Sequence, residues 1–224
     1  MTTTLPAQLL VLAKSPLPGS VKTRLCPPYS PYAAAALAEA ALRDTLAAVA
    51  ATSLQRHVAA LDGAAGDWLP SGIDVIGQRG DGLDERIANA IDDAWASCDL
   101  PVVLIGMDTP QVTPGQLDEA ARQLLRPESD AVLGPSQDGG FWLIGLRRPD
   151  PRLIRGVPMS TSQTGAAQCA RLLGAGLRVH RLATVRDVDT AEDAAAVAAA
   201  APDGRFAAAV ARLATRPLCD AGTA

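Results

Sequence analysis

Three basic side chains follow the first apolar run of the chain within eleven residues. The run 9–13 ends at Lys14, and the loop after it contains Gly19, Lys22 and Arg24 together with two prolines. The prolines restrict the backbone, and the glycine permits a positive φ angle or a close approach by a ligand. Cations on a rigid loop directly after a strand suit the binding of a polyphosphate. A solvated basic turn is the alternative interpretation.

Three aspartates elsewhere in the sequence are candidate metal ligands. Asp108 directly follows the apolar run 102–105, where a carboxylate either ligates a metal ion or caps a turn. Asp187 and Asp189 are one residue apart, so in an extended segment they face the same side and could share a divalent cation. The alternative for this segment is a helix N-cap by Asp189 or Thr190, because an alanine-rich helical pattern with acidic residues in its first turn follows, and both interpretations can hold together.

A fourth aspartate, Asp138, precedes Gly139, Gly140 and Phe141. This arrangement suits a wall around a ligand, in which Asp138 orients an acceptor or acts as a general base. An Asp-Gly dipeptide is also an ordinary hairpin turn signal, so turn formation alone could explain it.

A glycine-punctuated loop with Gln78, Gly80 and Arg86 runs into an amphipathic helix and could receive a base or ribose. Its spacing matches neither the Rossmann fingerprint nor the Walker A loop, so the signal is weak. The segment 160–165 could bind an anion at a helix start, but we favour helix capping there.

Composition weighs against several classes of protein. The chain of 224 residues is 48% hydrophobic, carries a net charge of −4 and contains 3% aromatic residues, which disfavours nucleic-acid binding. Its four cysteines are far apart and it has two histidines, which disfavours a zinc site or a disulfide framework. The first residues resemble neither a signal peptide nor a membrane span, so we expect a cytoplasmic protein.

Strand and helix patterns alternate along the chain, and this predicts a mostly parallel sheet covered on both faces. We expect strands at 9–13, 56–61, 73–76, 102–105, 130–133, 141–146 and 177–182. We expect helices at 31–50, 84–97, 114–125, 163–173, from 190 onward, and 205–213. The turn that contains Asp138 indicates one antiparallel strand. The prediction is one domain over 1–214 and a frayed tail at 215–224. Ligands of such sheets bind beyond the carboxyl ends of the strands, where the candidate residues would meet.

Taken in order, the motifs within 13–25, 78–86, 106–110, 134–140 and 187–193 resemble a known family. It is the bacterial glycosyltransferase-like family associated with radical-SAM/selenodomain and arsenosugar gene neighbourhoods, within the nucleotide-diphospho-sugar transferase superfamily. The resemblance covers about residues 9–193 and implies a three-layer α/β/α GT-A (Rossmann-like) fold. Two departures are Phe141, where the family usually has tyrosine, and Met107, where serine is common. The first puts acceptor recognition in doubt.

The basic loop also resembles, more distantly, that of the 2-phospho-lactate and molybdenum-cofactor guanylyltransferases. Two reactions therefore compete: transfer of a sugar from a nucleoside diphosphate, and transfer of a nucleotidyl group from a nucleoside triphosphate with release of pyrophosphate. The single Asp108, where glycosyltransferases of this fold usually place an Asp-x-Asp pair, favours the second. The family resemblance favours the first. A catalytically silent, nucleotide-binding regulatory domain is a third hypothesis.

The residues and the resemblance together imply a site for a nucleotide or nucleotide-sugar donor, a small-molecule acceptor and Mg²⁺ or Mn²⁺. The expected donor-binding residues are Ala13, Lys14, Gly19, Lys22, Arg24, Gln78, Gly80 and Arg86. The expected metal ligands are Asp108, Asp187 and Asp189, and the expected acceptor-binding residues are Gly139, Gly140 and Phe141. The expected catalytic residues are Lys22, Asp108 and Asp138. A homodimer is the general expectation for such a protein.

Overall fold

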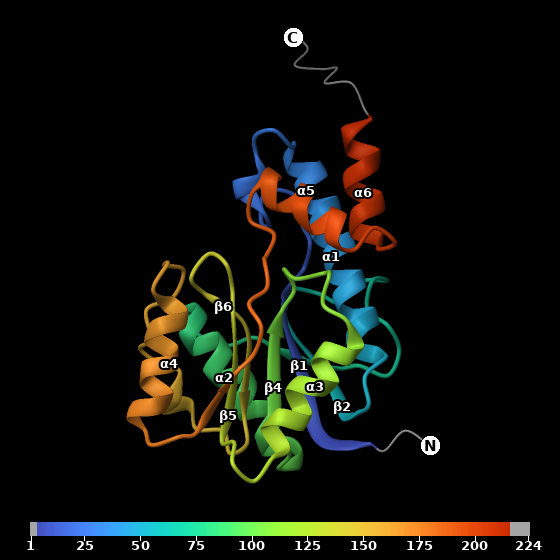
Figure 1. The fold of residues 1–224 in the computed structure, drawn as a ribbon. Coiled ribbons are helices and arrows are strands. Elements are labelled where there is room, and N and C mark those ends of the chain that lie inside the picture. Colours follow the sequence, from blue (N-terminus) through green and yellow to red (C-terminus); the bar gives the residue numbers. More distant parts are fainter. Residues whose placement is uncertain (1–3, 216–224) are drawn as a thin grey trace.

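The computed structural model describes residues 4–215 and contains one seven-stranded sheet (Figure 1). The strands are β1 (Leu5–Lys14), β2 (Leu54–Asp62), β3 (Asp74–Gly77), β4 (Val102–Gly106), β5 (Ala131–Pro135), β6 (Phe141–Leu146) and β7 (Val179–Arg181). The α-helices are α1 (Pro31–Ala50), α2 (Leu83–Cys98), α3 (Pro114–Leu125), α4 (Thr164–Gly174), α5 (Ala191–Ala200) and α6 (Arg205–Ala214). Two short 3₁₀ helices are η1 (Thr23–Leu25) and η2 (Pro151–Leu153).

The strand order is β3-β2-β1-β4-β6-β5-β7, and β6 alone runs antiparallel to its two neighbours. A short turn joins β5 to β6, which is sufficient only for an antiparallel pair, whereas the parallel strands β1 and β2 are linked through α1 and the parallel strands β2 and β3 through the loop 63–73. The expected α/β fold, a mostly parallel sheet with one antiparallel strand, is confirmed.

Helices cover both faces of the sheet and form a separate buried cluster on each. Leu9 and Val11 of β1 pack with α1 and α3 on one face, and Leu10 packs with α2 on the other. Alternate residues of a strand point to opposite faces, so a strand buried on both faces needs a continuous apolar run. This is the pattern that the sequence shows at β1 and β4.

A third cluster lies where α5 and α6 pack against α1 (Figure 1). Its members include Leu25, which directly follows Arg24, and Val188, which lies between Asp187 and Asp189. Two segments that carry candidate site residues are therefore anchored in one apolar cluster.

The ends of several elements follow the expected local signals. Thr113 and Thr190 each form a capping box with the residue three positions later, Gln116 and Asp193 respectively. Strand β1 begins earlier than the expected residue 9. The polar Gln8 interrupts the apolar pattern in the sequence, yet it lies within the strand and is fully buried. Its amide donates to the carbonyls of Ala94 and Leu100 at 3.1 and 3.0 Å, which satisfies the group.

Strand β7 is shorter than the expected 177–182. The expectation of one domain over 1–214 stays a prediction, and residues 216–224 of the expected tail lie outside the described residues. Among the helices of residues 4–215, none has the length and hydropathy needed to cross a membrane.

Candidate functional site

A cleft of about 740 Å³ opens where β1, β2 and β4 end, and residues of the β5–β6 turn and of the segment that precedes α4 also line it. Its lining residues from the strand ends are Lys14, Asp62, Gly106 and Asp108. This is the edge of the sheet at which ligands of open α/β folds bind.

Three carboxylates in the cleft lie close enough to share a cation. The groups of Asp138, Asp187 and Asp189 each offer an oxygen, and these oxygens lie within 4.8 Å of one another. Burial, followed by the charge of Asp138, raises the pKa of Asp187 to about 6. Oxygen ligands of this kind suit hard divalent cations such as Mg²⁺ and Mn²⁺. A cation would also relieve the repulsion among the three groups, so the residues present fit the expected metal.

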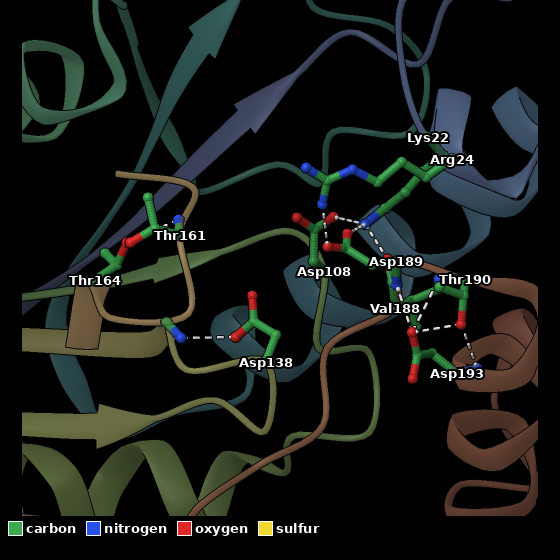
Figure 2. Close-up of polar contacts among 11 residues, drawn as sticks. Lys22, Arg24, Asp108, Asp138, Thr161, Thr164, Val188, Asp189, Thr190 and Asp193 are labelled. Carbon is green, nitrogen blue, oxygen red and sulfur yellow. Dashed lines mark hydrogen bonds and ion pairs between the residues drawn. The ribbon is translucent and has the colours of Figure 1, made fainter. Parts of the chain in front are cut away.

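Asp108 lies beside these carboxylates and is paired with Lys22. The distance from Lys22 Nζ to Asp108 Oδ1 is 2.7 Å, and that to Asp189 Oδ1 is 3.5 Å. Lys22 Nζ also donates to the carbonyl of Val188. Arg24 reaches the other oxygen of Asp189 at 2.9 Å. Figure 2 shows Lys22 and Arg24 converging on Asp108 and Asp189, with Asp138 on a separate turn.

Lys22 is the most constrained residue of the basic loop. Its side chain is 8% exposed and its φ angle is +50°, a conformation that L-residues rarely adopt. Burial alone would lower the pKa of Lys22, but the surrounding carboxylates, Asp108 first, raise it above its ordinary value. Lys22 is therefore charged, and its ion pairs connect the loop to the acidic residues.

The other residues of the loop differ from Lys22 in exposure. The side chains of Lys14 and Arg24 are 48% and 68% exposed, and both line the cleft. Gly19 has a φ angle of +76° with open space around it, and it is not among the cleft-lining residues of the described chain. Lys14 and Arg24 are thus the loop cations that can reach a ligand.

The segment 185–190, which carries Asp187 and Asp189, is held across the strand ends by hydrogen bonds. Val188 N donates to the carbonyl of Asp108 at 3.0 Å, and Gln137 N donates to that of Val185 at 3.0 Å. Arg186 donates to Gln137 Oε1 at 2.9 Å and to Asp193 Oδ1 at 3.1 Å. We call this segment the acidic strap.

The acidic strap ends in the cap of α5. The cap is Thr190, whose hydroxyl accepts from Asp193 N at 3.2 Å, while Asp193 accepts from Thr190 N at 2.9 Å. Because Thr190 fills the capping role, the carboxylate of Asp189 is left for the cleft. The two interpretations of this segment, metal ligation and helix capping, therefore involve different residues.

The expected nucleoside-binding residues form a second hydrogen-bonded group. The amide of Gln78 donates to the carbonyls of Ala13 and Ala60 at 2.7 and 2.9 Å, so both amide hydrogens are used within the protein. Arg86 donates to the carbonyl of Gly80 at 3.1 Å and to Asp62 at 2.8 Å. These contacts shape the β1 and β2 side of the cleft.

The turn around Asp138 is packed closely against the start of α4. Asp138 Oδ1 accepts from Gly140 N at 2.8 Å, and Gly165 N donates to the carbonyl of Gly139 at 2.8 Å. A Cβ on Gly139 would lie 2.1 Å from the carbonyl oxygen of Ser162. Gly139 therefore permits this close approach. Gly140 and Phe141 line the cleft, Gly139 is not among its lining residues in the described chain, and the acceptor-binding role of all three stays a prediction.

The segment before α4 does not supply the side-chain cap that the sequence favoured, because the N-cap residue is Gln163 and no side-chain capping hydrogen bond forms there. Its threonines instead stabilise the turn that leads into the helix. Thr161 Oγ1 accepts from Gln163 N at 3.2 Å, and Thr164 Oγ1 donates to the carbonyl of Pro158 at 2.9 Å. Ser160, Thr161 and Ser162 also line the cleft.

Two functional neighbours were not expected from the sequence. Asp62 contacts both Lys14 and Arg86, and its position at the end of an apolar strand was the available signal. Arg186 fastens the acidic strap, but nothing in its local sequence distinguishes it from other surface arginines.

Solved structures share this fold. A protein from Desulfovibrio desulfuricans G20, provisionally described as a nucleotide-diphospho-sugar transferase, is 28% identical with a TM-score of 0.75, and the match covers 82% of each chain. CMP:2-keto-3-deoxy-manno-octonic acid synthetase, solved with CTP, is 14% identical with a TM-score of 0.56 over 88% of this chain and 98% of that one.

A third structure is 2-C-methyl-D-erythritol 4-phosphate cytidylyltransferase from Thermus thermophilus. It is 14% identical with a TM-score of 0.51, over 93% of this chain and 99% of that one. At 14% identity, these last two structures show the fold alone. No curated protein matches the sequence. The model of the DUF2064 family, described as uncharacterized proteins conserved in bacteria, matches residues 35–161, more than half of the chain, and the chain therefore belongs to this family.

Proposed function

We propose that this protein is a metal-dependent transferase that moves a sugar from a nucleoside-diphosphate donor to a small-molecule acceptor. The observation that carries the proposal is the pairing, in one cleft, of three clustered carboxylates with the exposed cations Lys14 and Arg24. A divalent cation and basic side chains are what a departing diphosphate requires. The likeness to the Desulfovibrio protein supports a nucleotide-sugar donor.

The side chains divide into three roles. Asp187 and Asp189, with Asp138, would hold Mg²⁺ or Mn²⁺, which supplies charge neutralisation for the leaving diphosphate. Lys14 and Arg24, which line the same cleft, would bind the donor phosphates. Asp138 also lies beside the acceptor wall, where its carboxylate can orient an acceptor hydroxyl. We further propose that the protein belongs to the glycosyltransferase-like family associated with radical-SAM/selenodomain and arsenosugar gene neighbourhoods. We also propose that it is cytoplasmic.

Nucleotidylyl transfer is the second candidate, and the environment of Asp108 favours it. Asp108 is the only carboxylate in the segment 106–110, and Lys22 occupies one of its oxygens at 2.7 Å. In this reaction the cations would bind the β- and γ-phosphates while a phosphorylated acceptor attacks the α-phosphorus, and pyrophosphate would leave.

Thermal unfolding with a panel of donors tests the proposal. The midpoint is measured with Mg²⁺ or Mn²⁺ and, in turn, UDP-, GDP- and ADP-sugars, CTP, GTP and UTP. Stabilisation that requires both metal and a nucleotide sugar supports glycosyl transfer, whereas stabilisation by metal and a triphosphate alone supports nucleotidylyl transfer. Binding without any product in a long incubation would support the regulatory hypothesis.

A pair of variants shows whether the stabilisation arises in this cleft. Asp187→Asn removes a carboxylate of the cluster, and we expect it to abolish the metal-dependent shift. Asp67→Asn removes one that is 91% exposed and lies outside the cleft, and should leave the shift intact. Equal shifts in both variants would disprove the proposed site.

A further inference from the structure

Each carboxylate oxygen of Asp189 is paired with a basic side chain, and both of these side chains come from one loop. Arg24 lies 2.9 Å from Oδ2, and Lys22 lies 3.5 Å from Oδ1. Lys22 also lies 2.7 Å from Asp108. The basic loop that could grip donor phosphates is therefore docked on the carboxylates that could hold the metal (Figure 2).

The side chains of Lys22 and Arg24 differ in their burial and in the number of acceptors that they contact. The side chain of Lys22 is almost completely buried and has three acceptors: Asp108, Asp189 and the carbonyl of Val188. That of Arg24 is largely exposed and faces the cleft. Arg24 can exchange its carboxylate for a phosphate at little cost in desolvation, because water already reaches it.

We propose that Lys22 and Arg24 compete with the divalent cation for Asp189, so that the metal binds weakly by itself and tightly together with the donor diphosphate. The diphosphate draws Arg24 away from Asp189 and frees that oxygen for the ion. This inference rests on the proposed function, because it assigns an order of events to the same site. In this proposal Lys22 and Arg24 limit the binding of the metal alone and do not act as its ligands.

Electrostatics gives the direction of the effect. A fixed positive charge a few ångströms from a divalent cation repels it, because this separation is well below the distance over which salt screens charges. Removal of either basic side chain should therefore raise the affinity for metal alone. A role limited to holding the carboxylates in place predicts the opposite, because loosened ligands bind metal less well. The sign of the change separates the two roles.

The experiment measures Mn²⁺ binding by the loss of the free-ion signal in electron paramagnetic resonance, without nucleotide. The test variants are Arg24→Met and Lys22→Met, and the charge-matched control is Arg178→Met. Arg178 pairs with Asp130 at the amino end of β5, the opposite edge of the sheet from the cleft. We expect the dissociation constant of Mn²⁺ to fall by about tenfold in the test variants and by less than about twofold in the control.

A second arm adds UDP or GDP, with correction for the complex that these nucleotides form with Mn²⁺ in solution. The nucleotide should strengthen Mn²⁺ binding more in the natural protein than in Arg24→Met, because the variant has no ion pair to release. An equal gain in both proteins would overturn the order of events.

An unchanged or increased dissociation constant in Arg24→Met overturns the competition. If Lys22→Met fails to fold, as judged by circular dichroism, Arg24→Met decides alone, since its exposed side chain contributes little to packing. Asp187→Asn separates this inference from the proposed function. Mn²⁺ binding that persists in Asp187→Asn disproves the metal site itself. Binding lost there but unaltered in Arg24→Met disproves only the competition.

Discussion

Asp187 shows at the scale of one residue how the site conflicts with the stability of the fold. Burial and the neighbouring Asp138 raise its pKa to about 6, so its ionised form is disfavoured in the folded protein without metal. Clustered, partly buried carboxylates lower the stability of the folded protein, and a protein retains them where they bind a ligand. A bound cation converts this cost into binding energy.

We predict that Asp187→Asn stabilises the metal-free protein at neutral pH. The folded-state pKa of Asp187 lies above its value in the unfolded chain, so its ionisation lowers stability as the pH rises through about 6. The variant cannot ionise at this position. Its free energy of unfolding in urea with a chelator should exceed that of the natural protein at about pH 7.5, and the difference should shrink toward about pH 4.5. A difference that does not vary with pH would contradict this assignment.

The sequence predicted which residue types meet at the site better than it predicted their contacts. Lys22 and Val188 are 166 positions apart, and no local pattern indicates that one would donate to the other. The sequence placed Lys22 on donor phosphates, whereas the structure places it against Asp108 and Asp189. Such partners depend on how the loops fold over the sheet edge, which strand and helix periodicity does not encode.

At the scale of elements, the β5–β6 turn and the start of α4 form one closely packed wall of the cleft. Gly139 has a φ angle of +90°, and its carbonyl accepts from Gly165 N at 2.8 Å. An added Cβ on Gly139 would clash with the backbone of Ser162, which cannot move without the helix start. The conformation of one glycine therefore fixes the distance between two elements.

We predict that Gly139→Ala destabilises the protein more than Gly72→Ala. Gly72 has a similar φ angle of +85° but open space around its Cα, so its variant measures backbone strain alone, about 1 kcal/mol. The clash at Gly139 should add about 1–3 kcal/mol, because backbone must shift to relieve it. Urea unfolding of both variants measures the difference, and equal losses would show that the clash is relieved without cost.

Most elements were predictable because the chain alternates strand and helix periodicities with clear caps. The sequence located the helix α3 at 114–125 and the antiparallel strand after Asp138, and the structure has both. It missed the beginning of β1, because Gln8 interrupts the apolar pattern and finds its side-chain hydrogen-bond partners in distant segments. Tertiary hydrogen bonds of this kind leave no local signal.

At the scale of the whole molecule, the C-terminal helices connect the two halves of the site. Phe206 of α6 lies in the same buried cluster as Leu25, at the end of the basic loop, and Val188, in the acidic strap. The cluster therefore holds the loop and the strap against α1. Packing far from the cleft thereby sets the position of the candidate metal ligands.

We predict that Phe206→Ala weakens Mn²⁺ binding although Phe206 lies outside the cleft lining. Truncation of a buried phenylalanine should cost about 3–5 kcal/mol of stability, and the loss of support for Val188 should loosen the acidic strap. Phe206→Leu, which keeps most of the buried volume, should restore much of both properties. Stability lost without any change in Mn²⁺ affinity would show that the cluster does not position the site.

Identification of the products by ³¹P nuclear magnetic resonance tests the proposed reaction most directly. The protein is incubated with Mg²⁺ or Mn²⁺ and a panel of nucleotide sugars and nucleoside triphosphates, beside Asp187→Asn and Asp67→Asn. We predict release of a nucleoside diphosphate from a nucleotide sugar, dependent on metal, lost in Asp187→Asn and retained in Asp67→Asn. Pyrophosphate from a triphosphate, with nucleotide sugars left intact, would contradict glycosyl transfer, and turnover in Asp187→Asn equal to that of the natural protein would contradict the site.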